Sequence, residues 1–367
     1  MLVPASSEGP ILFARRLALI LLSGLLLAGP ARDVQAAAEP PKIRKPQPAP
    51  NTPPDVPPLP PAFFDPNLAV EGQDLKARKV ETRLTVQVLV NGRGPYNFIV
   101  DSGADTSVVG LRIARGLQLP LSTPAILNAM TARHVVDRVK VAQLTLGSST
   151  VENLHLPALR ESDLGGEGML GIDALVEQRL MMDFERRFIK VEDARTPVKR
   201  IPGEIVVIAR RQRGQLILTE VQAAGLSLDA VIDTGTEITI GNLALRDKLI
   251  RRNREKFTKI PVTGVTGTTV ELDLAKIAEL KLGPIVLHNV PMAFADVPPF
   301  KLFGLSGQPA LLLGTDILES FRRVSLDFRA RKVRFQLRRC QSQGIVIASS
   351  PETLTRISAT APDACSR

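Results

Sequence analysis

The sequence has few aromatic residues and almost no histidine or cysteine, and these shortages exclude several classes of protein. Aromatic residues form 4% of the 367 residues, with no Trp and one Tyr, so aliphatic side chains must supply most of the core packing. The three histidines show neither H-E-x-x-H nor another metal-ligand spacing, and no G-x-S-x-G occurs. A zinc hydrolase and a serine hydrolase therefore lack support, and we predict no metal site and no cofactor.

Two cysteines, Cys340 and Cys365, lie close to the C-terminal end. In an oxidising compartment they could form one disulfide that closes the tail, and two free thiols are the alternative; the sequence leaves both open. The sequence also has no N-x-[ST] glycosylation sequon, which fits a bacterial periplasm.

A hydrophobic run long enough for an ordinary membrane span of about 20 residues is missing. The N-terminal apolar run, residues 17–29, follows Arg15 and Arg16 and precedes small residues at 34–39. This order is typical of a secretory signal with an A-x-A-like cleavage site. We predict that residues 1–38 form a signal peptide and that the protein is exported to the periplasm or the extracellular space. An uncleaved membrane anchor is the alternative.

The formal net charge is +10, but the basic side chains are dispersed along the chain. The densest stretch, residues 321–339, interleaves them with apolar residues at strand spacing, which indicates the solvated face of a hairpin. A loose association with an anionic envelope surface is the alternative. No aromatic-rich basic motif occurs, so we expect no nucleic-acid partner.

Proline is concentrated in one segment near the N-terminus. Residues 40–61 contain 11 prolines, so this segment cannot form a helix or the core of a sheet. We predict that residues 39–64 form a semi-extended polyproline II linker and that the folded part begins within residues 65–80.

An internal repeat organises the rest of the chain. Four motifs occur twice in the same order: FIVDSGADTSVVG (98–110) and AVIDTGTEITIGN (230–242), KVAQLTLG (140–147) and KIAELKLG (276–283), MLGIDAL (169–175) and LLGTDIL (312–318), MDFERR (182–187) and LDFRAR (326–331). Their offsets are 132, 136, 143 and 144 residues, which grow slowly, as insertions in the second copy would produce. Four matches in register indicate a duplication.

The repeat divides the chain into two lobes. We predict a first lobe at residues 65–195 and a second at 204–340, joined by a linker near 194–203 and followed by a tail at 341–367. Each copy contains mostly short apolar runs separated by turn signals, which is typical of strands and hairpins. Both lobes are therefore expected to be β-rich.

Helices are expected to be few. We predict short helices at 172–179 and 315–321, each just after the glycine of the third motif, and a longer helix at 243–255. Asp173 and Asp316 would then be caps or turn acids at the start of the short helices.

Asp101 ends an apolar strand, where burial penalises a charge, and the repeat supplies a partner for it in Asp233. A pseudo-twofold axis between the lobes would bring these loops together. Two carboxylates about 3 Å apart cannot both ionise easily, so they share one proton. The ionised group can then take a proton from water while the protonated group polarises a peptide carbonyl. A pair of structural turns is the alternative.

The neighbours of the two aspartates fit this chemistry. Gly103 and Gly235 permit tight turns in which their N–H groups approach the carboxylates. Ser102 and Thr234 can hydrogen-bond across the axis and hold both loops rigid, as a precise site requires.

At these residues the sequence resembles the aspartic peptidases, both pepsin-like and retroviral-type. The D-[ST]-G loop occurs as DSGA and DTGT, and the apolar-apolar-Gly motif that supports each loop ends at Gly171 and Gly314. The resemblance, over roughly residues 80–340, implies an all-β bilobal barrel fold with the active site between the lobes. It also implies that Asp105 and Glu237 contact substrate; a surface acid or an internal salt bridge is the alternative for both.

The resemblance also bears on the flap that covers such a site. Pepsin-like enzymes carry a Tyr on the flap, whereas Tyr96 precedes the first motif, so the retroviral-type comparison fits better. Candidate flaps lie at residues 128–137 and 262–270. Retroviral-type enzymes are homodimers of one lobe; this chain carries both lobes, so we expect a single chain to be active.

Together these features predict an exported aspartic endopeptidase that binds a polypeptide in extended form, with Asp101 and Asp233 as its dyad. A peptide-binding protein of the same fold that no longer cleaves is the alternative, and the intact aspartates and glycines of both loops favour catalysis. A structural envelope protein, held by an uncleaved anchor and a proline-rich stalk, is a third interpretation.

Overall fold

The computed structural model describes most of the chain from residue 39 onward. The described residues are 39–50, 56–60, 73–76, 78–80, 83–147, 149–175, 178–193, 195, 197–198, 201, 203–253, 257–338, 345–350 and 353–355. The predicted signal peptide, both cysteines and about half of the predicted interlobe linker lie outside them. Among the described residues, no helix is both long and apolar enough to cross a membrane.

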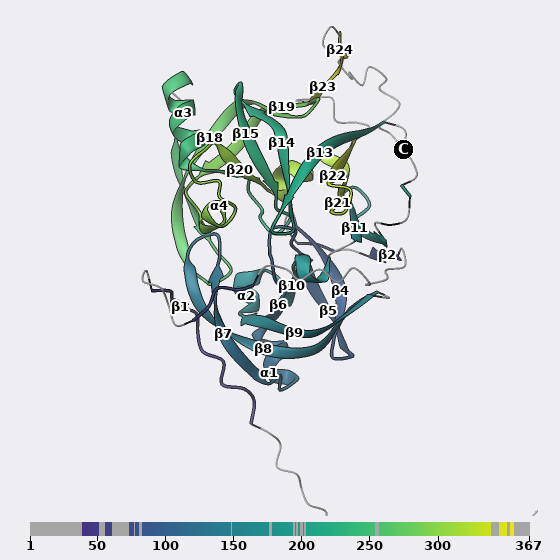
Figure 1. Ribbon diagram of the computed structural model, residues 1–367, viewed down its shortest axis with the longest axis vertical. Coiled ribbons are helices and arrows are strands. Elements are labelled where there is room, and N and C mark those ends of the chain that lie inside the picture. Colours follow the sequence, from purple (N-terminus) through teal and green to yellow (C-terminus); the bar gives the residue numbers. More distant parts are fainter. Residues whose placement is uncertain are drawn as a thin grey trace, which may run out of the picture. The chain divides into compact units, whose positions relative to one another are not determined.

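Strands dominate the described residues and form two sheets (Figure 1). The nine-stranded sheet contains β1 (Gln47–Pro48), β3 (Arg78–Val80), β4 (Arg83–Val90), β5 (Arg93–Val100), β6 (Val108–Gly110), β7 (Leu121–Asn128), β8 (Arg133–Leu146), β9 (Ser149–Leu159) and β10 (Gly168–Leu170). The fifteen-stranded sheet contains β2 (Gln73–Lys76), β11 (Gln178–Asp183), β12 (Phe188–Asp193), β13 (Glu204–Gln212), β14 (Gln215–Ala223), β15 (Leu226–Ile232), β16 (Ile240–Gly241), β17 (Thr258–Thr263), β18 (Thr269–Leu282), β19 (Ile285–Phe294), β20 (Ala310–Leu313), β21 (Phe321–Asp327), β22 (Lys332–Leu337), β23 (Ile345–Ser350) and β24 (Thr353–Thr355). The predicted all-β, two-lobed fold is confirmed.

The helices are short, and one prediction about them is wrong. They are α1 (Leu111–Gly116), α2 (Glu161–Leu164), α3 (Leu243–Asn253), α4 (Pro298–Leu302) and α5 (Thr315–Leu318), with a 3₁₀ turn η1 at Ile172–Ala174. The predicted helix at 172–179 is this single turn, because β11 begins at Gln178 and pairs with a strand on each side. Ladder hydrogen bonds on both edges override the local helical preference. The helix predicted at 315–321 ends at Leu318.

The local sequence explains the hairpin that leads to the first aspartate. β4 buries most of its β-branched and leucine side chains, and β5 ends in the buried residues Phe98, Ile99 and Val100. Between them Asn91 and Gly92 have φ angles of 50° and 71°, the left-handed values that a two-residue hairpin turn requires.

The two lobes repeat the same strand pairing around their aspartates. In the first lobe β10 lies parallel to β5 and antiparallel to β6. In the second lobe β20 lies parallel to β15 and antiparallel to β16. Each strand that leads into a dyad aspartate therefore lies beside the strand of its own apolar-apolar-Gly motif.

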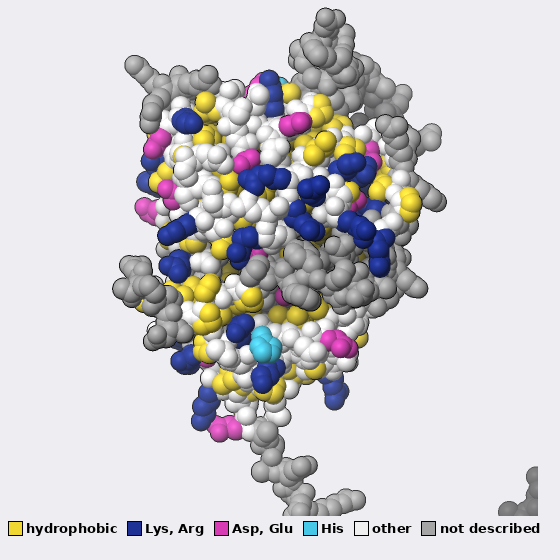
Figure 2. Space-filling model, viewed as in Figure 1, with side chains coloured by type: hydrophobic (Ala, Val, Ile, Leu, Met, Phe, Trp, Pro, Cys, Tyr) yellow, Lys and Arg dark blue, Asp and Glu magenta, His cyan; other side chains and the backbone are white. Residues whose placement is uncertain are grey.

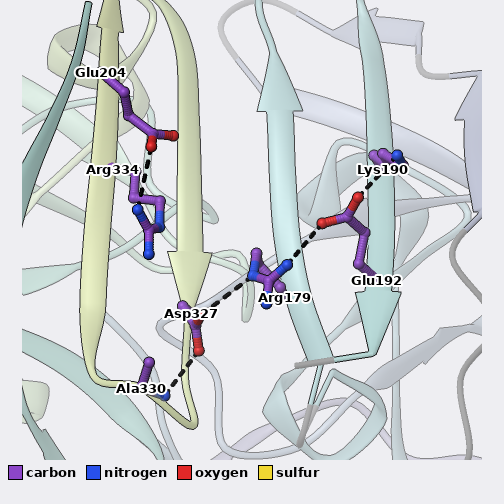
Figure 3. Close-up of polar contacts among 7 residues, drawn as sticks. All are labelled: Arg179, Lys190, Glu192, Glu204, Asp327, Ala330 and Arg334. Atoms are coloured by element: carbon purple, nitrogen blue, oxygen red, sulfur yellow. Dashed lines mark hydrogen bonds and ion pairs between the residues drawn. The ribbon is translucent and has the colours of Figure 1, made fainter. Parts of the chain in front are cut away.

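Strands of the first copy join the sheet of the second through β11 and β21. These two strands pair antiparallel, with Arg179 opposite Asp327 and Asp183 opposite Arg323. Arg179 Nε contacts Asp327 Oδ2 at 3.2 Å (Figure 3), and Arg323 Nε contacts Asp183 Oδ2 at 2.6 Å. The side chains of Asp327 and Asp183 are only 2% and 0% exposed. Two ion pairs with buried aspartates therefore join the two copies, and the two pairs occupy equivalent positions of the repeat.

The basic stretch at 321–339 forms the β21/β22 hairpin as expected, but its arginines are not simply solvated. Arg322, Arg323 and Arg334 pair with Glu185, Asp183 and Glu204, and their side chains are 13%, 19% and 14% exposed. The acidic partners come from segments distant in sequence, so the spacing of residues within 321–339 could not predict these ion pairs. On the face drawn in Figure 2, Lys and Arg side chains are scattered among apolar and uncharged ones.

The proline-rich segment differs from the predicted linker. β1 pairs with β8, and Arg44 forms an ion pair with Asp137 of β8. Ile43 packs against the main hydrophobic core. The segment therefore lies against the first lobe, because prolines at a sheet edge can still accept hydrogen bonds through their carbonyl groups.

Candidate active site

Asp101 and Asp233 lie at the ends of the equivalent strands β5 and β15. The N–H of Asp101 donates to the Leu170 carbonyl over 2.9 Å, and that of Asp233 donates to the Leu313 carbonyl over 3.0 Å. Both aspartates are buried and line the same cavity, and the loop of each passes directly against the carboxyl group of the other. The structure thus brings together the two residues that the repeat paired.

Ser102 and Thr234 tie the two loops together by reciprocal hydrogen bonds. Thr234 Oγ1 donates to the Val100 carbonyl over 2.8 Å and accepts from the Ser102 N–H over 2.9 Å. Ser102 Oγ donates to the Ile232 carbonyl over 3.0 Å and accepts from the Thr234 N–H over 3.2 Å. Each hydroxyl bridges to the opposite lobe, so the spacing of the carboxyl groups depends on both residues.

Gly103 and Gly235 pass too close to the opposite aspartate to carry a side chain. A Cβ on Gly103 would lie 2.6 Å from Asp233 Cγ, and one on Gly235 would overlap the Asp101 carboxyl group. Their N–H groups donate to Asp101 Oδ1 over 2.8 Å and to Asp233 Oδ1 over 3.0 Å. The close approach of the two loops therefore requires glycine at both positions.

The environment raises the pKa of both dyad carboxyl groups. Burial is the largest cause in each case. For Asp101 the negative charge of Asp233 acts in the same direction, while the N–H groups of its own loop oppose it. A buried pair of this kind retains one shared proton at pH values where an isolated aspartate has lost it.

Thr236 is a source of asymmetry in the dyad. The Thr236 hydroxyl donates to Asp233 Oδ2 over 3.0 Å and so favours the ionised form of that group. The equivalent residue in the first loop is Ala104, whose N–H donates to Asp101 Oδ1 but which has no hydroxyl. The geometry therefore favours the charge on Asp233 and the proton on Asp101.

A buried carboxyl group supports the first dyad loop from behind. Ser107 donates both its N–H and its hydroxyl to Asp173, with 2.6 Å between Ser107 Oγ and Asp173 Oδ1. The N–H of Gly171 in turn donates to Ser107 Oγ over 3.0 Å. Burial raises the pKa of Asp173 to about 6, against the opposing hydrogen bonds from Ser107.

The second loop has the same support. Thr239 donates its hydroxyl to Asp316 over 2.7 Å, and the Gly314 N–H donates to Thr239 Oγ1 over 3.1 Å. The expected cap role of Asp173 and Asp316 is therefore secondary, since both carboxyl groups bind the loop that follows the dyad aspartate. Residue spacing could not show this, because the two partners lie 66 and 77 residues away.

Asp105 and Glu237 form ion pairs across the lobes. Asp105 Oδ2 lies 2.8 Å from Arg213, and Asp105 Oδ1 accepts from Gln215 Nε2 over 2.6 Å. Glu237 Oε1 lies 2.7 Å from Arg83. Both acids also line the cavity above the dyad, so contact with substrate stays a prediction beside this internal pairing.

The sequence interpretation missed Arg83 and Gln215. Arg83 begins β4 and forms an ion pair with Glu237 of the second lobe. Gln215 begins β14 and donates a hydrogen bond to Asp105 of the first lobe. Arg83 and Gln215 are separated by the same number of residues in the sequence as Asp101 and Asp233. Extending the repeat toward the N-terminus of each copy would have identified them.

A cavity of about 440 Å³ lies over the dyad, and both predicted flaps line it. Residues 128–130 at the end of β7 form one part of its wall, and residues 260–265 at the end of β17 form another. Both stretches belong to hairpins, β7/β8 and β17/β18, at equivalent places in the two lobes.

Each hairpin tip packs on the opposite lobe. Met130 of the first hairpin packs against a cluster of buried apolar residues in the second lobe. Val265 of the second hairpin packs against the first-lobe cluster around Val108 and Met169. The tips also approach each other, since Thr268 Oγ1 lies 3.3 Å from His134 Nε2. The cavity is therefore covered from both lobes.

Two β-rich lobes that each contribute an aspartate to a shared, buried pair define a bilobal acid-dyad protein. A family model described as aspartyl protease matches residues 86–174 and 219–317, one match in each lobe. These matches cover more than half of the chain, which therefore belongs to the aspartyl protease family. No curated protein sequence matches it.

Proposed function

We propose that this protein is an exported aspartic endopeptidase, active as a single chain, that hydrolyses peptide bonds with water activated between Asp101 and Asp233. The observation that carries the proposal is the buried pair of carboxyl groups beneath a cavity of about 440 Å³. The signal-like pattern in residues 1–38 supports export. Family membership supports a protease-type function.

In the first step the water oxygen attacks the peptide carbonyl carbon. Ionised Asp233 takes a proton from that water, and protonated Asp101 gives its proton to the carbonyl oxygen, which yields a neutral tetrahedral diol. In the second step the C–N bond breaks, Asp233 gives its proton to the amine nitrogen, and a diol hydroxyl returns a proton to Asp101. The products are a carboxylic acid and an amine, and the dyad is restored.

The substrate would bind as an extended polypeptide beneath the two hairpins. Their backbones can pair with an extended chain, which is how sheet edges recognise peptides. Apolar residues such as Leu127, Ile260 and Val262 line the cavity, so apolar substrate side chains fit beside the scissile bond.

The test is cleavage of a diverse peptide library from pH 3 to 8 by the wild-type protein, Asp101→Asn and Asp233→Asn. We expect cleavage by the wild type, its inhibition by a statine-type transition-state analogue, and at least a 10³-fold loss in each variant, since each step needs both groups. Cleavage that survives both substitutions would reject the dyad mechanism. A folded wild type that binds peptides and cleaves none would support the alternative, a silent peptide-binding protein.

Exchanging the residues that make the dyad asymmetric should move the pH profile of kcat/KM. Thr236→Ala removes a hydroxyl that favours ionised Asp233, so the acid limb should move up by about one pH unit. Ala104→Ser adds a comparable donor beside Asp101, so the alkaline limb should move down. Unchanged limbs in both variants would contradict the assignment of the charge to Asp233.

A further inference from the structure

The proline-rich segment adds a strand to the β8 edge of the first hairpin. β1 pairs antiparallel with β8, with Gln47 opposite Val135, and the Ala49 N–H donates to the Arg133 carbonyl over 3.0 Å. On its other side Val135 lies opposite Ile126 of β7. At this level β8 is therefore an inner strand with a partner on both sides.

The same segment returns to the β7 edge of that hairpin. The Ile126 N–H donates to the Pro57 carbonyl over 2.8 Å, and the Leu59 N–H donates to the Ile126 carbonyl over 3.0 Å. Pro58 lies opposite Ile126 in a parallel bridge. Prolines lack an N–H, so they suit an outermost strand whose other edge needs no donor. The first hairpin is thus flanked on both edges.

A buried carboxylate anchors this segment. Asp137 of β8 accepts the Arg44 N–H over 2.8 Å and the Arg44 guanidinium through both carboxylate oxygens. The Asp137 side chain is 6% exposed. Burial would raise the pKa of Asp137, but the hydrogen bonds and the charge of Arg44 outweigh it and hold the pKa below its usual value. Without Arg44, the hairpin would hold a desolvated charge.

The flanking strands make the two sides of the cleft unequal. Among the described residues, no strand pairs with the outer edge of β17, the strand equivalent to β7. On the first-lobe side Leu59 lines the cavity that contains both dyad aspartates, together with Val108 and Leu127. The cavity remains open, so the segment borders the site and does not fill it.

We propose that the proline-rich segment is a fixed wall of the substrate cleft and that Leu59 selects the substrate side chain lying beside the β7 edge. This inference rests on the proposed peptidase function. Leu59, Val108 and Leu127 are apolar, so the selected side chain is apolar. The predicted signal peptide ends at residue 38, so its removal would leave the wall in place.

The selectivity test compares Leu59→Ala with the wild type in the mature chain, using peptides that differ at one position at a time. Shortening the isobutyl side chain to a methyl group should favour larger apolar side chains at one position, and the ratio of kcat/KM values there should change by roughly tenfold or more. Leu121→Ala is the matched control, because Leu121 is an exposed leucine of β7 that does not line the cavity. An active Leu59→Ala enzyme with the wild-type preference would overturn the proposal.

A second measurement does not depend on activity. Arg44→Met should speed hydrogen exchange of the Ile126 amide, which is bonded to Pro57, by tenfold or more. Lys42→Met is the control, since Lys42 pairs with an exposed glutamate. Fast exchange of the Ile126 amide in the wild type would reject the fixed wall, and so would a uniform rise in kcat/KM of Arg44→Met for all peptides, which would identify an inhibitory strap.

The two ideas fail in distinguishable ways. If the wild type cleaves no peptide, the proposed function fails, while the exchange experiment still decides whether the segment is fixed to the hairpin. If the wild type cleaves peptides and Leu59→Ala keeps the same preference, the peptidase stands and the selective wall fails.

Discussion

Replacing Asp101 by Asn is expected to raise the free energy of unfolding at neutral pH while abolishing cleavage. The dyad carboxyl groups are buried against each other, and burial and the Asp233 charge raise the pKa of Asp101 in the folded protein. Asn has a similar shape and is neutral without binding a proton, so folding no longer requires a proton to be held on a buried carboxyl group at neutral pH, while its carbonyl oxygen can still accept from the Gly103 N–H. The site would thus gain stability as it loses function.

The sign of the effect depends on pH. An unfolded aspartate has a pKa of about 3.9, so between that value and the raised folded pKa the folded state binds more protons than the unfolded state. The free energy of unfolding therefore falls as pH rises through this window. Asp101→Asn lacks this loss, so its advantage should be near zero at pH 3 and at least about 1.4 kcal/mol at pH 7, the equivalent of one pKa unit.

Chemical denaturation at pH 3, 5 and 7 measures this difference. Asp247→Asn is the control, because the Asp247 side chain is 47% exposed and the substitution removes a charge from the surface instead of from the buried dyad. A wild type as stable as Asp101→Asn at every pH would show that folding does not raise the pKa of Asp101. A variant that is less stable at pH 7 would reject the raised pKa.

Arg179→Met and Arg323→Met are each expected to lower the free energy of unfolding by about 3–5 kcal/mol. Arg179→Met leaves Asp327 without its cation, and Arg323→Met does the same to Asp183. Both carboxylates are almost fully buried, so water cannot replace the lost partner. Because β11 and β21 join the two copies, the substitutions should also lower the cooperativity of unfolding and reduce cleavage.

Arg322→Met is the matched control for Arg323→Met, because both arginines lie on β21. Arg322 pairs with Glu185, whose side chain is 46% exposed and can be hydrated once the arginine is gone, so we expect a change within about 1 kcal/mol. Equal effects of Arg322→Met and Arg323→Met would show that burial of the acid does not decide the cost. Loss of less than about 1 kcal/mol in both Arg179→Met and Arg323→Met would reject the structural role of these two ion pairs.

Much of the site could be inferred without coordinates. The repeat identified Asp101 and Asp233 as partners, and small residues after each aspartate indicated a tight, hydroxyl-braced loop. This was possible because a duplication places equivalent residues at similar offsets, and because an acid at the end of an apolar strand is costly unless it has a purpose. The β-rich character of both lobes followed from period-two patterns and turn residues.

Inferences about partners distant in sequence succeeded less often. Asp105 and Glu237 were expected at the substrate or in an unspecified salt bridge, and Arg213 and Arg83 of the opposite lobe proved to be their partners. The helix expected at 172–179 gave way to β11, whose partners β12 and β21 satisfy both edges. Such outcomes depend on which strands meet and in which register.

The sequence by itself determined the duplication, the β-rich lobes and the identity of the paired aspartates, since these rest on local pattern and on comparison of the chain with itself. The tertiary structure alone decided which lobe pairs each acid, how arginines pair with buried aspartates between the two copies, and where the prolines lie. The physical reason is that hydrogen bonds and ion pairs between distant strands are selected by burial. A proline-rich stretch looks like a free linker until Asp137 and the edges of the β7/β8 hairpin supply its partners.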